Sequence, residues 1–387
     1  MTEKQYFLHL AKSFINGTAP QNSENIDTAK LMRLANIHTL SGMVCYMADK
    51  YSLFGSDAEK YKSVYLKTVI LMTKRDIKAT RLFEEFEKNG IDYITFKGYV
   101  VKNYYPVSEL RTYGDIDFAI KYADREKSHK LMLSLGYECT TDYGEVYSYR
   151  KNEEYYEIHT SVMTVNFSDK ADFIGYFKEI YKNALLTRGQ HGYQFTPQFH
   201  FIYLLCHIAK HIYGEGAGIR MYMDIALFIK HFYNNNDIWD GIARQLEGLN
   251  LTDFADTVFS ATEEWFGISP PLKFNKKDIA EFTEYTLEGG TFGFENTDRG
   301  VSAIRQSGNG ESKAKAFFGL IFPSADKIEA RYTFLKDRHY LLPVAWAVRF
   351  FATFSTRREN MQRLKNIADA DIGKAQKQRD FLKGLGL

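Results

Sequence analysis

The sequence predicts an α+β fold, in which a small mixed β-sheet at residues 90–165 is flanked by an N-terminal helical region, 1–89, and a larger C-terminal helical domain, 166–387. Apolar residues recur with a helical period in both flanking regions and with a period of two in the middle region. The composition, with 45% hydrophobic and 25% charged residues, is that of ordinary globular domains. These observations argue against a disordered, collagen-like or disulfide-scaffold protein.

The N-terminal region is predicted to be helical throughout. Its first segment is amphipathic and carries charged residues every few positions, which argues against a secretory signal peptide. Two longer helical segments, Ile26–Tyr51 and Tyr61–Asn89, follow it. The dipeptide Asn89-Gly90 is a typical helix stop, so we expect the helical region to end there.

The middle region is predicted to hold four strands, because short segments rich in β-branched and aromatic residues alternate in polarity. The strands are expected at Ile91–Phe96, Asp115–Ile120, Val146–Arg150 and Tyr155–His159. Between the strands, Tyr99–Tyr105 and Asp124–Leu135 are predicted to be helical, and Asp124 is the expected N-cap of the second helix.

The C-terminal domain is expected to be helical apart from one long loop. Helices are expected at Asp172–Leu186, Pro197–Ile212, Arg220–Tyr233, Asp237–Leu246 and Leu251–Phe266, and again from about Lys313 to the end. The stretch Glu288–Ser312 holds six glycines and few apolar residues, which predicts a loop. The most apolar stretches are interrupted by His207, Pro343 and Arg349, so we expect no membrane span.

Charge and cysteine content narrow the expected partners and setting. The 50 Lys and Arg residues nearly balance the 48 Asp and Glu residues, which argues against a long nucleic acid or an anionic membrane as the partner. Three widely separated cysteines, Cys45, Cys139 and Cys206, fit neither a disulfide framework nor a paired-cysteine zinc site. We therefore expect a cytoplasmic protein, and the sequence leaves its oligomeric state open.

The clearest candidate for a metal site is the pair Asp115 and Asp117. The two residues stand two positions apart on a predicted strand, so both side chains point to one face, about 6.6 Å apart. Two adjacent carboxylates repel each other unless a cation lies between them, and Mg²⁺ or Mn²⁺ accepts such oxygen ligands. The segment beginning at Gly114 also fits a turn, since Asp is a poor strand former.

A third carboxylate and a phosphate-binding turn extend this pattern. Glu157 and His159 share one face of the last predicted strand, so three carboxylates are available for two divalent ions. Upstream, Lys97-Gly98 lies where the first strand meets a helix. Free backbone N–H groups bind phosphate at such a junction, Lys adds charge and Gly allows close approach. The order of these features suits phosphoryl chemistry, with the active site expected in a cleft between the sheet and the helices.

In this order the features resemble the DNA polymerase β-like nucleotidyltransferase superfamily, and in particular its branch of uncharacterised bacterial nucleotidyltransferase family proteins. The resemblance, which covers nearly the whole chain, is carried by Ile94-Thr95-Phe96-Lys97-Gly98, Tyr105-Pro106, Leu110-Arg111, Gly114–Phe118, Leu135-Gly136-Tyr137, Glu157-Ile158-His159, Leu204–His211, Gly218-Ile219-Arg220, Asp224-Ile225-Ala226, Phe322-Pro323-Ser324 and Arg331-Tyr332. The superfamily usually has Gly-Ser or Gly-Gly where this chain has Gly98-Tyr99. The contact from a Ser hydroxyl to phosphate is therefore missing, and Lys97 would have to replace it.

The resemblance implies a nucleotidyltransferase core that transfers a nucleoside monophosphate from an NTP, with ATP expected, to a hydroxyl of an unknown acceptor and releases pyrophosphate. It implies that Asp115, Asp117 and Glu157 hold Mg²⁺ or Mn²⁺. It places the nucleotide-binding residues at Lys97, Gly98, Tyr99, Arg111, Gly114, Lys210, His211, Arg220 and Asp224. The acceptor would be a small molecule or a protein.

Arg220, Asp224 and Arg111 also have structural interpretations. Arg220 and Asp224, four apart on a predicted helix, also fit a simple ion pair. Arg111 lies four residues before Asp115 and would either reach a phosphate or pair with that carboxylate. Both readings stay open at the level of sequence.

The histidines also allow more than one role. His207 and His211 have the spacing of a metal-binding pair, but no Glu follows His207 to complete the HExxH zinc signature. We therefore expect Lys210 or His211 to face the active-site cleft, near the triphosphate or the acceptor. His159 would either tune Glu157 or take the proton of the acceptor hydroxyl.

Two other functions fit the sequence. The first is a non-catalytic nucleotide-binding sensor or scaffold, against which the intact set of Asp115, Asp117 and Glu157 argues. The second keeps the chemistry but nucleotidylates a protein or an RNA end. The near-neutral charge weighs against a long RNA, although the basic tail after Arg357 offers a local patch.

Overall fold

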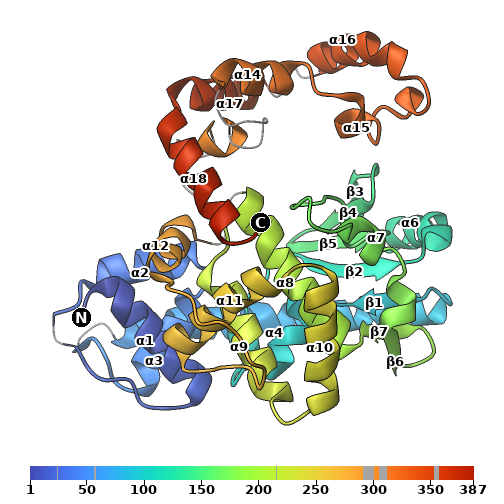
Figure 1. Cartoon of the computed structure of the whole chain (residues 1–387). Coiled ribbons are helices and arrows are strands. Elements are labelled where there is room, and N and C mark those ends of the chain that lie inside the picture. The colour runs from blue at the N-terminus through green and yellow to red at the C-terminus, as the bar shows by residue number, and fades with distance from the viewer. Residues whose placement is uncertain (24, 56–57, 215, 291–299, 305–311, 353–356) are drawn as a thin grey trace. The chain divides into compact units, whose positions relative to one another are not determined.

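A computed structural model of the chain describes all residues except 24, 56–57, 215, 291–299, 305–311 and 353–356. The chain forms two compact units, of which the first comprises residues 1–212 and 216–292 and the second 213–215 and 293–387 (Figure 1). The described residues of the first unit contain one seven-stranded mixed sheet among helices, which confirms the predicted α+β class. The three-part division expected from the sequence stays a prediction.

Among the described residues that precede the sheet, the helices are α1 Glu3–Asn16, α2 Thr28–Ile37, α3 Ser41–Lys50 and α4 Ala58–Lys88. The helix α1 begins at a capping box, in which Thr2 and Gln5 each bond the backbone N–H of the other. It ends at Gly17, whose φ of 69° is the left-handed conformation that glycine tolerates best. The helical character predicted for this region is therefore observed, with a break between α2 and α3.

The strands are β1 Tyr93–Thr95, β2 Ile116–Ile120, β3 Glu138–Thr141, β4 Val146–Lys151, β5 Glu154–His159, β6 Ala184–Arg188 and β7 Gly192–Phe195. Their order in the sheet is β3-β4-β5-β2-β1-β7-β6. The strand β2 is therefore central, antiparallel to β1 and parallel to β5. Short helical segments, α5 Gly98–Val101 and a 3-10 turn Lys102–Tyr104, connect β1 toward β2, and α6 Arg125–Ser134 follows β2.

Three strands, β3, β6 and β7, were not predicted, and the expected helix at 172–186 is wrong. That segment forms the short helix α7 Phe173–Tyr176, a 3-10 turn Ile180–Asn183 and then β6. The strands β3 and β6 are the two edges of the sheet, and exposed residues alternate with partly buried ones in β3 and predominate in β6. Leu185 and Leu186 of β6, for example, are each about half exposed. Because β6 has no buried face, its sequence shows no alternation of polarity that would identify it as a strand.

The helix α4 covers one face of the sheet. Its Phe83 and Phe86 contact Phe118 of β2, with ring centroids 5.3 Å and 5.1 Å apart. Because side chains alternate along a strand, Asp117 points to the opposite face. On that face Phe96 packs against Tyr203 of α8 Pro197–Gly214, with ring centroids 5.2 Å apart. The face that carries Asp117 is therefore the one that meets α8.

In the described part of the first unit, α8 is followed by α9 Ile219–Phe232, α10 Asn236–Gly248, α11 Thr252–Phe266 and α12 Ala280–Gly289. The amide of Asn16, at the end of α1, donates to the carbonyl of Phe266 at 2.8 Å. The first helix thus packs with the late helix α11, and the N-terminal helices share one compact unit with the sheet.

The second unit contains α14 Lys313–Ile321, α15 Ala325–Ile328, α16 Leu342–Ala352, α17 Arg357–Asp369 and α18 Ile372–Gly384. Most of the loop predicted at 288–312 lies outside the described residues, since 291–299 and 305–311 are not described. Among the helices of the described residues, none combines the length and the apolar character needed to cross a bilayer.

Candidate functional site

The centre of the candidate site is formed by Asp117, Glu157 and His159. In the parallel pairing of β2 with β5, Asp117 lies directly beside Glu157, so both side chains stand on one face. His159 follows two positions later on β5 and shares that face. One ligand atom from each of the three residues lies within 4.8 Å of the others. The sheet register therefore brings together two of the predicted metal ligands and the predicted histidine.

His159 binds Asp117 directly. Its Nε2 lies 2.7 Å from Asp117 Oδ1 and 3.8 Å from Glu157 Oε2. Burial lowers the pKa of His159, and its hydrogen bond to Asp117 offsets part of that effect. Since an ionised carboxylate only accepts hydrogen bonds, Nε2 is the donor. His159 therefore orients Asp117.

Lys97 is the second partner of Asp117. Its Nζ donates to Asp117 Oδ1 at 2.7 Å. Burial works against both charges, but their mutual attraction prevails, so the pKa of Asp117 is held below its usual range and that of Lys97 is raised. The sequence placed Lys97 at the nucleotide phosphates, and that role stays a prediction. In this structure its ammonium group is engaged by Asp117.

Glu157 lies in a strongly acidic setting. Burial raises its pKa to about 7, and the charges of Asp117 and Asp115 act in the same direction, while Lys97 and Lys210 oppose them. A third carboxylate in such a group ionises readily only when more positive charge is added. The group therefore fits a divalent cation, because hard oxygen ligands of this kind are those that Mg²⁺ or Mn²⁺ takes.

Asp115 stands one residue before β2 and is half-buried. Burial and the charge of Asp117 raise the pKa of Asp115. Its carboxylate is not among the three ligand groups that lie within 4.8 Å of one another in the described residues. The preceding Gly114 is exposed, and a Cβ added there would meet no atom within 4 Å. The metal role of Asp115 and the nucleotide role of Gly114 stay predictions.

The helix α8 supplies polar and basic groups to the site. Lys210 and His211 are half-buried near its C-terminal end. Burial and the charge of Lys97 lower the pKa of Lys210, and the charges of Asp117 and Glu157 oppose that shift. Burial and the nearby Lys97 and Lys210 lower the pKa of His211 to about 4. Lys210 forms no ion pair with any residue that the structure describes.

The histidine pair of α8, His207 and His211, has no further metal ligand among the described residues. His207 and His211 pack edge to face with ring centroids 4.5 Å apart. In the described part of the chain, no third ligand joins them in a metal-binding group.

Tyr99, the residue in place of the superfamily's Ser, packs against Phe83 with ring centroids 5.4 Å apart. Its ring therefore lies on the α4 side of the sheet, away from Asp117.

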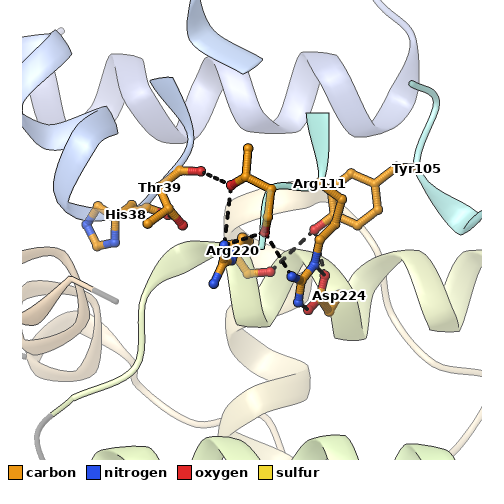
Figure 2. A network of polar contacts seen from close by, with 7 residues as sticks. His38, Thr39, Tyr105, Arg111, Arg220 and Asp224 are labelled. Carbon is orange, nitrogen blue, oxygen red and sulfur yellow. Dashed lines mark hydrogen bonds and ion pairs between the residues drawn. The ribbon is translucent and has the colours of Figure 1, made fainter. Parts of the chain in front are cut away.

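The helix α9 contributes a buried network around Asp224 (Figure 2). Arg111 donates to Asp224 through Nε at 3.1 Å and through Nη2 at 2.5 Å, and the Tyr105 hydroxyl donates to the same carboxylate at 2.7 Å. The sequence-based pairs are therefore wrong. Arg111 pairs with Asp224 rather than with Asp115, and Arg220 is not the ion partner of Asp224.

Arg220 instead holds the segment that leads to β2. Its Nη1 donates to the carbonyl of Thr112 at 2.5 Å, and its Nε is buried without a partner among the described residues. Burial and the charge of Arg111 lower the pKa of Arg220 to about 10. Like Lys210, Arg220 forms no ion pair within the part of the chain that the structure describes.

Sequence reasoning missed Tyr105, Thr112 and Tyr203 as parts of this site. Tyr105 and Asp224 are 119 positions apart, so no local pattern links them. Thr112 takes part through its backbone carbonyl, which any residue carries. Tyr203 appears in the sequence as one apolar position of a helix, and only packing places its ring beside Phe96. A comparison of related sequences is the signal that would have found them.

Residues 24–267, well over half of the chain, match a protein family described as uncharacterised nucleotidyltransferase. No curated protein matches the chain significantly. A solution structure of the antibiotic-resistance factor ANT(2'')-Ia aligns with 46% of this chain and 93% of its own, with 9% sequence identity and a TM-score of 0.34. That similarity is too low to transfer any property to this chain.

Proposed function

Since the chain belongs to the uncharacterised nucleotidyltransferase family, we propose that it transfers a nucleoside monophosphate from ATP, with Mg²⁺ or Mn²⁺, to a hydroxyl group of an acceptor and releases pyrophosphate. Family membership supports the transferase class. The identity of the nucleotide, of the metal ion and of the acceptor group goes beyond what family membership supports.

The observation that carries this proposal is the separation of charge within the site. Asp117 and Glu157 lie side by side on the sheet. The charge of Lys210 on α8 opposes the rise in the pKa of Glu157, the charge of Arg220 on α9 opposes the rise in the pKa of Asp115, and neither cation has a carboxylate partner among the described residues. A metal-bound triphosphate has the complementary charges, with a cation for the carboxylates and phosphate oxygens for the two unpaired cations.

Asp115, Asp117 and Glu157 are the residues that would hold the divalent cation. When bound, such an ion supplies positive charge that neutralises the charge developing on the transferred phosphoryl group and on pyrophosphate. The donor set fits it, because Asp117 is kept ionised and Glu157 ionises fully only with added positive charge.

The remaining residues act by positioning and by electrostatics. Lys210 and Arg220 bind phosphate oxygens, with Lys97 joining them when its bond to Asp117 opens. His159 keeps Asp117 oriented through the hydrogen bond at 2.7 Å. The acceptor proton passes to Glu157 or to His159, which share the face of the sheet that carries Asp117.

The experiment that tests this proposal joins calorimetry with a pyrophosphate-release assay. We expect ATP to bind only with Mg²⁺ or Mn²⁺, and Asp115→Asn to abolish both binding and release. The control is Glu126→Gln, an exposed carboxylate on α6 paired with Lys130. Binding without release in the presence of candidate acceptors would favour a sensor, and metal-independent binding would contradict the proposed site.

The nucleotide and the acceptor are identified in separate steps. A thermal-shift screen of all four NTPs with Mg²⁺ identifies the nucleotide, because a ligand that binds only the folded state raises Tm. Intact-mass analysis of small-molecule and protein acceptors after incubation then looks for the mass of one added nucleoside monophosphate. If adducts form only on a protein or on an RNA end, the acceptor is that macromolecule and not a small molecule.

A further inference from the structure

Gly98, the first residue of α5, has no room for a side chain. A Cβ built on Gly98 would lie 2.4 Å from Nη1 and 2.7 Å from Cζ of Arg111. The guanidinium group of Arg111 thus packs directly against the Lys97-Gly98 backbone. The need for glycine at this position comes from a neighbouring side chain, since the φ of Gly98 lies outside the left-handed range.

Asp224 holds Arg111 in that place. The carboxylate receives two hydrogen bonds from the guanidinium group and a third from the Tyr105 hydroxyl, as Figure 2 shows. Arg111 and Asp224 are only 7% and 3% exposed. A buried guanidinium group cannot leave its counter-charge without a large desolvation cost, so its position against Gly98 is set by α9.

Lys97 depends on this support. Its backbone has φ 53° and ψ −139°, a conformation that non-glycine residues adopt only when the surroundings enforce it. The Lys97 carbonyl accepts bonds from the backbone N–H groups of Val100 and Val101, and its Nζ binds Asp117 at 2.7 Å. The backbone of the turn therefore decides where the ammonium group can reach.

The same network reaches the segment that carries the aspartates. Arg111 Nη1 donates to the Thr112 carbonyl at 3.0 Å, and Arg220 Nη1 donates to the same carbonyl. The hydroxyl of Thr112 donates in turn to the carbonyl of Thr39 at 2.9 Å. Thr112 lies three residues before Asp115, so both chain segments of the site are anchored to α9.

We infer that Asp224, acting through Arg111, is a positioning residue that fixes the Lys97-Gly98 turn, and that Gly98 is required because the guanidinium group lies where a Cβ would be. Arg111 therefore supports the turn by packing its guanidinium group against the Gly98 backbone, and it does not bind phosphate. The inference rests on the proposed function only where kcat is measured, because the measurements of Tm and of lysine labelling need no nucleotide.

A double-mutant cycle of Gly98→Ala and Arg111→Gln tests the steric part. Gly98→Ala alone is expected to lower kcat on the order of 100-fold, because the turn is displaced. The shorter Gln removes the clash while keeping a donor for Asp224. We expect Gly98→Ala to add no further loss in the Arg111→Gln background, in turnover and in Tm alike. Effects that simply multiply would overturn the inference.

The matched control for the glycine change is Gly248→Ala at the end of α10. A Cβ there would meet no atom within 4 Å, and the backbone is not left-handed. We expect kcat and Tm of this variant to stay at the wild-type values. Loss of activity in Gly248→Ala comparable to that in Gly98→Ala would show that glycine replacement harms the chain in general, and would overturn the steric argument.

A measurement without nucleotide tests the positioning part. Acetic anhydride labelling read by mass spectrometry reports how accessible the Lys97 ammonium group is. In Asp224→Asn, which keeps the size of the side chain but removes its charge, we expect Lys97 to be acetylated several-fold faster than in the wild type. Lys121, which pairs with Asp92 elsewhere on the sheet, should react at an unchanged rate and reports any global loosening.

The outcomes separate this inference from the proposed function. Unchanged Lys97 labelling in Asp224→Asn overturns the positioning role, whatever the enzyme does with ATP. A wild-type chain that never turns over an NTP defeats the proposed function alone, because the labelling and the Tm cycle still decide whether Asp224 positions the turn.

Discussion

Acidification is expected to destabilise the first unit through His38. This side chain is fully buried, stacks on Phe7 with ring centroids 5.3 Å apart, and joins three helices. Its Nδ1 accepts from the backbone N–H of Ile219 at 3.1 Å, and its Nε2 lies 3.2 Å from the carbonyl of Leu287. Since Ile219 donates to Nδ1, that nitrogen must carry no proton, and Nε2 is the donor to Leu287.

The loss of unfolding free energy on acidification follows from the difference in the pKa of His38 between the folded and the unfolded chain. Burial lowers the pKa of His38 to about 4, and the hydrogen bond to Leu287 offsets only part of that effect. The unfolded chain, with an ordinary pKa of about 6.5, binds more protons between these two values. The contribution of neutral His38 to the free energy of unfolding is therefore fully present above about pH 6.5 and is lost as the pH falls toward 4. The total is about 3 kcal/mol, at about 1.4 kcal/mol for each pH unit.

The assay is urea unfolding of the full chain at pH 7 and pH 4.5, for the wild type and for His38→Asn. The Asn oxygen replaces Nδ1 as acceptor but does not titrate, so other titrating groups affect both proteins alike. We expect the stability advantage of the wild type to shrink by about 2.5 kcal/mol between the two pH values. An advantage that is equal at both would refute the reasoning.

Three further predictions concern the site and the fold. Lys210→Met should weaken binding of Mg²⁺-ATP by about 10-fold in calorimetry, because an unpaired cation facing phosphate is lost, while Tm stays within 2 °C or so of the wild type. Asp224→Ala should lower the free energy of unfolding by about 3–5 kcal/mol in urea titration, because Arg111 keeps a buried charge without a partner; a loss below about 1 kcal/mol would contradict the buried pair. Phe83→Ala should cost a similar amount, because it opens a cavity beneath the sheet where the ring contacts Phe118, and wild-type stability would count against that packing.

Part of the candidate site could be predicted because its signals are local. Asp115 and Asp117 on one strand, and Glu157 and His159 on another, follow from a side-chain period of two. The period of two along each strand does not show that the two strands are neighbours in the sheet. The register Asp117 beside Glu157 joins residues 40 positions apart and depends on the parallel pairing of β2 with β5.

The edge strand β6 was missed for a related reason. A strand with exposed side chains on both faces carries little hydrophobic alternation, as Leu185 and Leu186 illustrate. The segment containing them reads as helical when local spacing is the only guide. Its pairing with β7, which in turn lies beside β1, is a long-range interaction that assigns it to the sheet.

Hydrophobic periodicity and residue chemistry are local properties, so they were sufficient to predict the α+β class, four strands with a buried face and the acidic residues of the site. Which charges are partners depends on the folded arrangement. It paired Lys97 with Asp117 and Arg111 with Asp224, and it left Lys210 and Arg220 without a carboxylate among the described residues. The physical reason is that a buried charge must be compensated by whichever group the fold brings to it, and the distance along the chain places no limit on that choice.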